Sequence, residues 1–303
     1  MHPESRHAEG RTGSADTERD AMRMDETSAQ LIRAALAEDL GPGDVTTDST
    51  IPEDQRSEAV LVAREDGVVA GLDVAAAVFA ELSSGVEFVA QVVDGARVHR
   101  GEHLATVRGS TRAIVSAERV ALNFLQHLSG VATMTAAMVA RLEGSKTRLL
   151  DTRKTAPGMR YLEKQAVALG GGDNHRMGLW DMALIKDNHI AAAGSIAVAV
   201  GLVRGARPDV AIEVEVTNRA ELEEALSSGV DRVMLDNMSL QEMGSCISAA
   251  REHPSAPEIE ISGGVTEESL PGLAALGADF ISMGAITHSA PALDISLELE
   301  AAA

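Results

Sequence analysis

The second half of the chain repeats one pattern, in which a short apolar run is followed by a segment with helical spacing of its apolar residues. Strands that alternate with helices pack as a parallel sheet, because each helix returns the chain to the end where the next strand begins. Such runs end at Asp151 (RLLD), Asp187 (ALIKD), Val216 (IEVEV), Asp236 (RVMLD), Gly264 (IEISGG) and Gly284 (FISMG). This is fewer than the eight strands of a complete barrel, so we predict an incomplete α/β barrel of about six to seven parallel strands.

The first half of the chain has a different pattern of apolar residues. Apolar spacing predicts a helix from about Glu26 to Gly41. Between Ser57 and Gly109, short alternating stretches separated by glycines predict small antiparallel strands, with a helix at Val74 to Leu82 between them. A long apolar-periodic stretch from about 113 to 142 predicts two helices, with a break near Ser129 and Gly130. The chain is therefore expected to be an α/β protein of two domains.

Composition excludes several classes of function. A formal charge of -20 and only one Trp, one Tyr and four Phe argue against nucleic-acid binding, which favours basic patches with stacking aromatics. Cys246 is the single cysteine, so no disulfide framework is expected. No apolar run is long enough to span a bilayer, and residues 1–24 lack the apolar core of a signal peptide. We expect a cytoplasmic protein without a membrane partner, and a disordered extension at 1–24.

One stretch reverses the local charge. Residues 149–190 contain six Lys or Arg and five Asp or Glu, in a chain that is otherwise strongly acidic. Glycines and polar residues, including Gly170 to His175, are interleaved with these basic side chains and favour loops that approach a ligand closely. The stretch predicts a site for an anion, although a salt-bridged surface loop would have the same composition.

Polar residues follow the predicted strands at their carboxyl ends, where α/β barrels collect their active sites. Lys186, Glu215 and Asp236 each end a different strand, and a period of two places Glu213 on the same face as Glu215. The alternative for these charges is an internal Lys–Glu ion pair. Glu215 and Asp236 form a carboxylate pair suited to Mg²⁺ or to ribose hydroxyls. The glycine-bearing ends predict a phosphate site made by Ser262, Gly263, Gly264 and Gly284.

Several long motifs resemble the quinolinate phosphoribosyltransferase family. They are EDLGPGDVTTD, ERVALNFLQHLSGVAT, DTRKTAPGMRYLEKQAVALGGGDNHRMGL, LIKDNHI, IEVEV, LDN, SGG, GAITHS and ALDISL, and they extend over most of the chain from Leu31 to Leu299. The resemblance implies an N-terminal α/β sandwich domain at 25–128, an α/β barrel catalytic domain at 129–288, and a C-terminal segment at 289–303 that returns to the first domain. It also implies a homodimer or higher oligomer in which Arg119 reaches the neighbouring subunit's site.

The implied reaction joins quinolinate to 5-phosphoribosyl 1-diphosphate, with Mg²⁺, and gives nicotinate mononucleotide, diphosphate and CO₂. By the family pattern, Lys154, Lys186, Glu215 and Asp236 are the catalytic residues, and Glu215 and Asp236 also hold the metal. Quinolinate would bind Arg119, Arg153, His175, Arg176 and Lys186. The phosphoribosyl and phosphate groups would bind Lys154, Ser262, Gly263, Gly264, Gly284 and His288.

Two alternatives keep the fold but change the function. One is a related pyrophosphorylase-like enzyme with another acceptor, against which the basic residues at both ends of the acceptor pocket argue. The other is a non-catalytic protein that binds a phosphoribosyl ligand. Simple phosphate capture does not need Lys154, Lys186, Glu215 and Asp236 together, so an enzyme is favoured.

Overall fold

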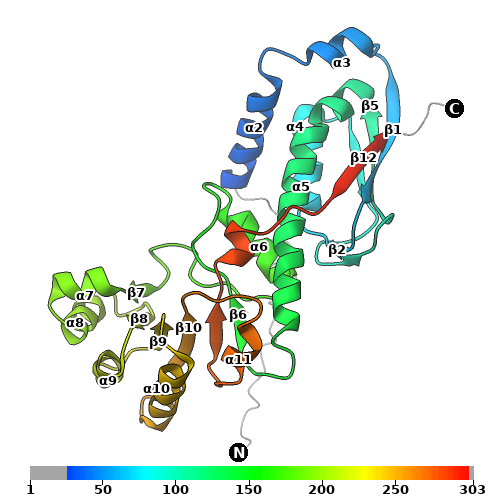
Figure 1. The fold of residues 1–303 in the computed structure, drawn as a ribbon. Coiled ribbons are helices and arrows are strands. Elements are labelled where there is room, and N and C mark those ends of the chain that lie inside the picture. Colours follow the sequence, from blue (N-terminus) through cyan, green and yellow to red (C-terminus); the bar gives the residue numbers. More distant parts are fainter. Residues whose placement is uncertain (1–25, 300–303) are drawn as a thin grey trace, which may run out of the picture.

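The structure, a computed structural model, describes residues 26–299. The predicted extension at 1–24 and the last residues of the predicted C-terminal segment lie outside this range. The described chain forms two lobes, with an antiparallel sheet and its helices in one and a parallel sheet in the other (Figure 1). The α/β class and the incomplete barrel predicted from the sequence are confirmed.

The first lobe is built on a four-stranded antiparallel sheet in the order β12-β1-β5-β3. Leu61 and Val107 of this sheet share one buried core with Val78 and Phe79 of a covering helix. The strand nearest the C-terminus pairs with β1, so the end of the described chain returns to the first lobe. Elements of this lobe are α2 (Glu26–Leu40), α3 (Val45–Thr50), β1 (Arg56–Ala63), β2 (Gly67–Val68), α4 (Leu72–Leu82), β3 (Glu87–Ala90), β4 (Arg97–Val98), β5 (His103–Ser110) and β12 (Ile295–Leu299).

The second lobe carries six parallel strands in the order β6-β11-β10-β9-β8-β7. The strands are β6 (Arg148–Leu150), β7 (Ala183–Ile185), β8 (Ile212–Val216), β9 (Arg232–Asp236), β10 (Glu258–Ser262) and β11 (Phe280–Ser282). A single parallel bridge joins Leu150 of β6 to Asp173. Asp173 therefore occupies, as one residue only, the place of a seventh strand beside β6. Within 26–299, the edge strands β6 and β7 do not pair with each other, so the barrel stays open.

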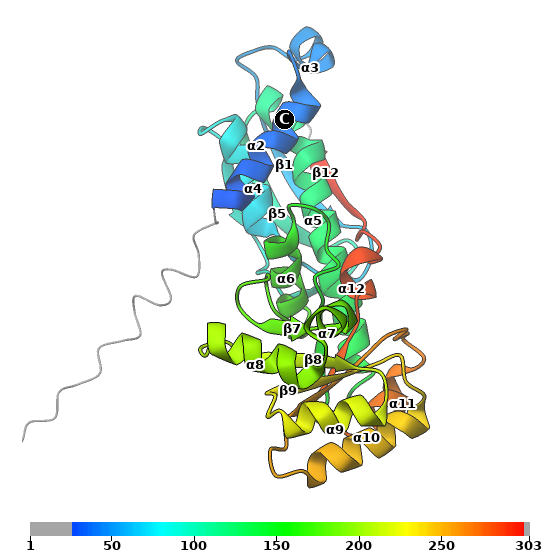
Figure 2. The same cartoon turned by 90° about the vertical axis from the view of Figure 1, so that its left-hand side faces the viewer.

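Helices cover the outside of these strands (Figure 2). Three of them begin at a residue whose side chain accepts the backbone N–H three positions later, which satisfies one free donor of the first turn. These residues are Ser195, Asn218 and Ser239, before α8 (Ile196–Ala206), α9 (Arg219–Ser227) and α10 (Leu240–Glu252). The remaining helices of this lobe are α6 (Arg160–Leu169), α7 (Asp187–Ala193), α11 (Leu270–Ala274) and α12 (Ala285–His288), of which α6 and α12 pack against α5.

A single helix, α5 (Thr111–Ala140), joins the two lobes, and the predicted break near Ser129 and Gly130 is wrong. Gly130 instead lets the segment before β12 approach the helix closely, since a Cβ there would lie 2.0 Å from the Pro291 carbonyl oxygen. Ser129 Oγ accepts the Ala70 N–H at 3.0 Å. Both small residues serve contacts between segments, and the helical hydrogen bonds continue through them.

We expect Gly130→Ala to lower the free energy of unfolding by about 3 kcal/mol, at the upper end of overpacking effects, because the added methyl meets backbone rather than a movable side chain. Gly201→Ala in α8 is the matched control. Its Cβ meets nothing within 4 Å, so helix propensity is expected to raise stability by about 0.5–1 kcal/mol. Denaturant unfolding of both variants measures the difference, and equal effects would contradict the close approach.

A carboxyl group beside the first turn of α4 gives the first lobe a pH dependence. Asp94 Oδ1 accepts the Leu72 N–H at 3.1 Å, and burial raises the pKa of Asp94 to about 6. Between pH 3.8 and about 6 the folded state keeps a proton that the unfolded state releases, so stability falls as pH rises through this window.

Asp94→Asn mimics the protonated carboxyl and keeps the acceptor for Leu72. Its stability relative to the unsubstituted protein is expected to increase from pH 4 to pH 7 by about 1–2 kcal/mol, after allowance for partial exposure of the carboxyl. Thermal unfolding of the two proteins at both pH values is the measurement. A constant difference across the range would show that Asp94 does not titrate there.

Across residues 26–299, none of the helices taken singly has the length and apolar character to cross a membrane, whereas α7 and α8, bent by 89°, reach that threshold only as a pair.

Candidate active site

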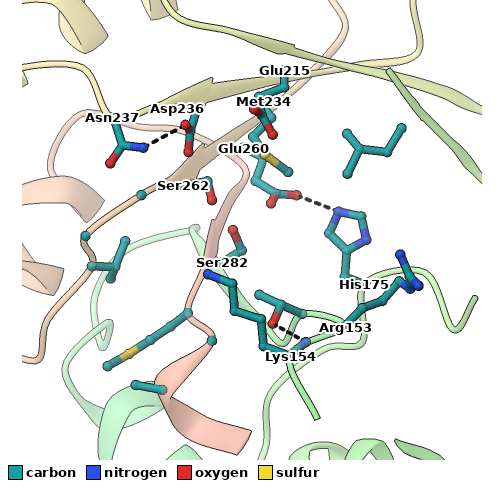
Figure 3. Close-up of a pocket in the computed structure, with 18 of the residues that line it drawn as sticks. Arg153, Lys154, His175, Glu215, Met234, Asp236, Asn237, Glu260, Ser262 and Ser282 are labelled. Carbon is teal, nitrogen blue, oxygen red and sulfur yellow. Dashed lines mark hydrogen bonds and ion pairs between the residues drawn. The ribbon is translucent and has the colours of Figure 1, made fainter. Parts of the chain in front are cut away.

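A cavity of about 720 Å³ opens at the carboxyl ends of the parallel strands (Figure 3). It lies where the sequence predicted the site, since each strand of the sheet contributes residues at or just after its end. Every candidate residue except Arg119 lines it: Arg153, Lys154, His175, Arg176, Lys186, Glu215, Asp236, Ser262, Gly263, Gly264, Gly284 and His288. The structure thus brings these side chains together, while their individual roles stay predictions.

Two guanidinium groups form a basic end of the cavity. Arg153 follows β6, and its Nε is buried without a hydrogen-bond partner among the described residues. Arg176 donates to the Met182 carbonyl oxygen at 3.1 Å. Burial, and next the positive charge of Arg153, lower the pKa of Arg176. Like charges held together with a free donor favour an anionic ligand between or beside them.

His175 lies against two buried carboxyl groups. Its Nδ1 accepts the Arg176 N–H at 2.7 Å, and its Nε2 lies 2.9 Å from Glu213 Oε2 and 3.5 Å from Glu260 Oε2. Because Nδ1 accepts a backbone N–H, the ring proton resides on Nε2. Burial lowers the pKa of His175, which favours this neutral tautomer. Nδ1 is thus engaged by the backbone, whereas Nε2 lies near both carboxyl groups but makes no hydrogen bond among the described residues. A neutral ring held in this way is suited to orienting a ligand.

The carboxyl groups under His175 are partly protonated near neutral pH. Burial raises the pKa of Glu213 to about 7, and burial together with the charge of Glu213 raises that of Glu260 to about 8. The side chains of His175, Glu213 and Glu260 are close enough to one another to hold a metal ion. A proton on His175 Nε2 opposes metal binding there, so this cluster is better described as a buried, partly protonated layer beneath the cavity.

Lys186 and Glu215 face each other at the ends of β7 and β8. Lys186 Nζ donates to Glu215 Oε2, so the internal ion pair considered as an alternative is present. Both side chains nevertheless line the cavity, and the Lys186 side chain is 43% exposed. On the next strand, Asp236 Oδ2 accepts from Asn237 Nδ2 at 2.7 Å (Figure 3). Because Lys186 and Glu215 both line the cavity, a bound ligand can compete with either residue for its partner in their ion pair.

A tight turn after β10 forms the opposite end of the cavity. Gly263 has a φ of +90°, and a Cβ there would lie 2.3 Å from Asn237 Oδ1. Both facts require glycine at this position. Gly284 immediately precedes α12 and lies beside Lys154 and His288. The Lys154 backbone is held by Thr287, whose Oγ1 donates to its carbonyl oxygen at 2.7 Å.

Sequence reasoning missed several residues of the cavity. Asn237 and Ser282 line it, and so does Glu260, which is fully buried. The period of two that placed Glu213 beside Glu215 also puts Glu260 and Ser262 on one face of β10, so the same pattern could have identified Glu260. Asn237 has a positive φ of 53°. The LDN motif contains it, yet nothing in the motif alone marks this conformation.

Arg119 lies apart from this cavity. It is an exposed residue of α5 and does not line the cavity of its own chain. The prediction that it serves a neighbouring subunit is not tested by a single chain.

Comparison with known proteins gives the family. Residues 44–129 match the family described as Quinolinate phosphoribosyl transferase, N-terminal domain, and residues 131–298 match its C-terminal domain. The chain is 42% identical over 290 residues to the nicotinate-nucleotide pyrophosphorylase [carboxylating] of Mycobacterium leprae (strain TN), covering 94% of this chain and 99% of that protein. It is also 42% identical over 287 residues to quinolinate phosphoribosyltransferase [decarboxylating] 1b of Nicotiana tabacum, covering 89% and 81%.

Solved structures agree. The fold is similar to that of the nicotinate-nucleotide pyrophosphorylase from Francisella tularensis, with a TM-score of 0.86 and 39% identity, covering 92% of this chain and 98% of that one. The two family matches cover both lobes and include all the residues that line the cavity. The chain belongs to the quinolinate phosphoribosyl transferase family.

Proposed function

We propose that this protein transfers the phosphoribosyl group of 5-phosphoribosyl 1-diphosphate to quinolinate, with decarboxylation, in de novo NAD biosynthesis. The products are nicotinate mononucleotide, diphosphate and CO₂, so the enzyme is a pentosyltransferase. Family membership and the names of its relatives support this activity. In the site itself, the observation that carries the acceptor assignment is the half-buried pair Arg153 and Arg176, in which the buried Nε of Arg153 is an unused donor.

The acceptor is held at the basic end of the cavity. Quinolinate carries two carboxylates on adjacent ring carbons, and the guanidinium groups of Arg153 and Arg176 are charge-assisted donors for such groups. His175 orients the pyridine ring of quinolinate. Lys186 lies on the side of the cavity where the ring nitrogen meets the ribose. A neutral or mono-acid ring would leave part of this positive charge unpaired, which disfavours an enzyme with another acceptor.

The phosphoribosyl donor occupies the remainder of the cavity. The turn at Ser262 to Gly264 offers backbone donors to the 5′-phosphate, with Gly284 before α12 and His288 at the end of that helix. Lys154 and Lys186 face the diphosphate. Glu215 and Asp236 lie on adjacent strands, and their carboxylate oxygens are the donors that Mg²⁺ prefers beside a polyphosphate, so these residues fit the ion. Bound there, Mg²⁺ would neutralise charge on the departing diphosphate.

Catalysis by this site is positioning and charge stabilisation. The bond between ribose C1 and diphosphate breaks, the diphosphate leaves with the electron pair, and the pyridine nitrogen bonds to C1. Arg153 and Arg176 aim that nitrogen by holding the carboxylates, while Lys154 and Lys186 stabilise the leaving charge. The ring nitrogen is now positive, so the adjacent carbon releases CO₂, keeps the electron pair and takes a proton from solvent. No covalent intermediate with the protein is required.

The direct test is product formation from quinolinate, phosphoribosyl diphosphate and Mg²⁺, with nicotinate as a parallel acceptor. We expect nicotinate mononucleotide and CO₂ in equal amounts from quinolinate and no turnover of nicotinate. Turnover of nicotinate in place of quinolinate would indicate an acceptor with one carboxylate. Turnover of neither would reject the activity while leaving the family assignment unchanged.

We further propose that the enzyme acts in the cytoplasm as a homodimer or a larger assembly of dimers. The exposed position of Arg119 on α5, outside the cavity of its own chain, supports a role in the neighbouring subunit's acceptor site.

A further inference from the structure

Two consecutive charged residues of α6 are fully buried. Glu163 and Lys164 both have 0% of their surface exposed, and the reaction described above uses neither. Charged side chains are rarely buried to this extent unless they are paired. Consecutive residues of a helix point in directions about 100° apart, so the two side chains reach different neighbours.

Lys164 holds the segment that carries His175 and Arg176. Its Nζ donates to Asp151 Oδ1 and, at 2.9 Å, to the His175 carbonyl oxygen. Asp151 Oδ1 also accepts the His175 N–H at 2.8 Å. Lys164 and Asp151 therefore satisfy both backbone groups of His175 and tie them to the end of β6.

Glu163 holds the other basic segment. Its two carboxylate oxygens each lie 3.3 Å from the Ala156 N–H, which they accept. His127 Nε2 on α5 lies 2.8 Å from Glu163 Oε1. Ala156 closes the loop that begins with Arg153 and Lys154, so this contact anchors that loop to both helices.

Stability alone does not account for the buried Lys164–Asp151 pair. Burial lowers the pKa of Lys164 and raises the pKa of Asp151, while their mutual attraction opposes both shifts. Apolar residues of similar size often replace such a pair without loss of stability. What an apolar pair would not supply is the set of hydrogen bonds that fixes the backbone of His175.

We propose that Glu163 and Lys164 are positioning residues, each of which sets one basic segment of the cavity. Lys164, with Asp151, aligns His175 and Arg176, and Glu163 aligns the loop of Arg153 and Lys154. The inference rests on the proposed function, in which the first segment contacts quinolinate alone and the second contacts both substrates. The two residues should therefore affect the two substrates differently.

The main test uses the double variant Asp151→Asn with Lys164→Met, which leaves no uncompensated buried charge. We expect the KM for quinolinate to rise about tenfold, with kcat and the KM for phosphoribosyl diphosphate within about twofold. Calorimetric binding of benzene-1,2-dicarboxylate, an unreactive diacid with the same carboxylate spacing, should weaken by a similar factor. If this variant does not fold, Asp151→Asn with Lys164→Gln replaces the ion pair by an amide pair and gives the same comparison.

Glu163→Met should instead raise the KM of both substrates, because it releases the loop of Arg153 and Lys154 together. Glu163→Gln keeps an acceptor oxygen for Ala156 and is expected to recover most of the loss. Asp173→Asn is the matched control, since Asp173 is in the same segment as His175 but makes an exposed ion pair with Arg148 at 3.5 Å. Its kinetics should match those of the unsubstituted protein.

Two results with the folded Asp151→Asn, Lys164→Met protein would overturn the proposal. One is an equal change in the KM values for quinolinate and phosphoribosyl diphosphate, and the other is unchanged binding of benzene-1,2-dicarboxylate. A failure of the proposed function has a different signature. In that case the unsubstituted protein itself would not turn over quinolinate, while the comparison of diacid binding between the proteins would still decide whether Lys164 aligns the basic segment.

Discussion

Arg176→Ala is expected to raise the KM for quinolinate about a hundredfold and to leave the KM for phosphoribosyl diphosphate within about twofold. Each charge-assisted hydrogen bond contributes about 1.5–3 kcal/mol, and a guanidinium that binds a carboxylate through two donors loses both on truncation. The variant should fold, because the backbone N–H that Arg176 donates to His175 Nδ1 is retained. Initial-rate kinetics with each substrate varied in turn measure the effect.

Arg207→Ala is the control for a general effect of lost charge. Arg207 makes an exposed ion pair with Asp209 at 2.9 Å, outside the cavity, so both KM values should be unchanged. An equal rise in the two KM values of Arg176→Ala would count against the acceptor assignment, because it would indicate a distorted cavity rather than a lost carboxylate contact.

The second large effect is recovery of activity in mixed oligomers. Arg119→Ala and Lys186→Ala should each be nearly inactive alone. If Arg119 serves the neighbouring subunit, a hybrid dimer contains one complete site and one site that lacks both residues. Random exchange of equal amounts makes about half of the dimers hybrids, so the mixture should regain about a quarter of full activity.

Subunit exchange has to be verified independently, for example by native mass spectrometry of differently tagged chains. A mixture of Lys186→Ala with Asp236→Ala is the control, since both residues line the same cavity of one chain and a hybrid would contain no complete site. Absence of recovery in the Arg119 mixture after verified exchange would remove the shared site.

Much of the fold could be predicted because its elements depend on local patterns. Each of the six parallel strands ends within two residues of the end of a predicted apolar run, and the alternation in IEVEV placed Glu213 and Glu215 on one side of β8. The end of α4 at Leu82 was predicted correctly, but the helix begins two residues before the predicted Val74, directly after Gly71, whose φ is 99°. The break expected in α5 was wrong because a glycine and a serine that favour a break also permit close packing, and sequence cannot distinguish the two.

The sequence by itself determined the fold class, the order of the strands along the chain and the residue types that would meet at their carboxyl ends. Only the tertiary structure decided which groups are paired there. It placed Lys186 on Glu215, the His175 ring between Arg176 and the buried carboxyls, and Lys164 against Asp151. These contacts join residues from separate elements, and their charge states depend on burial, which no local pattern of residues specifies.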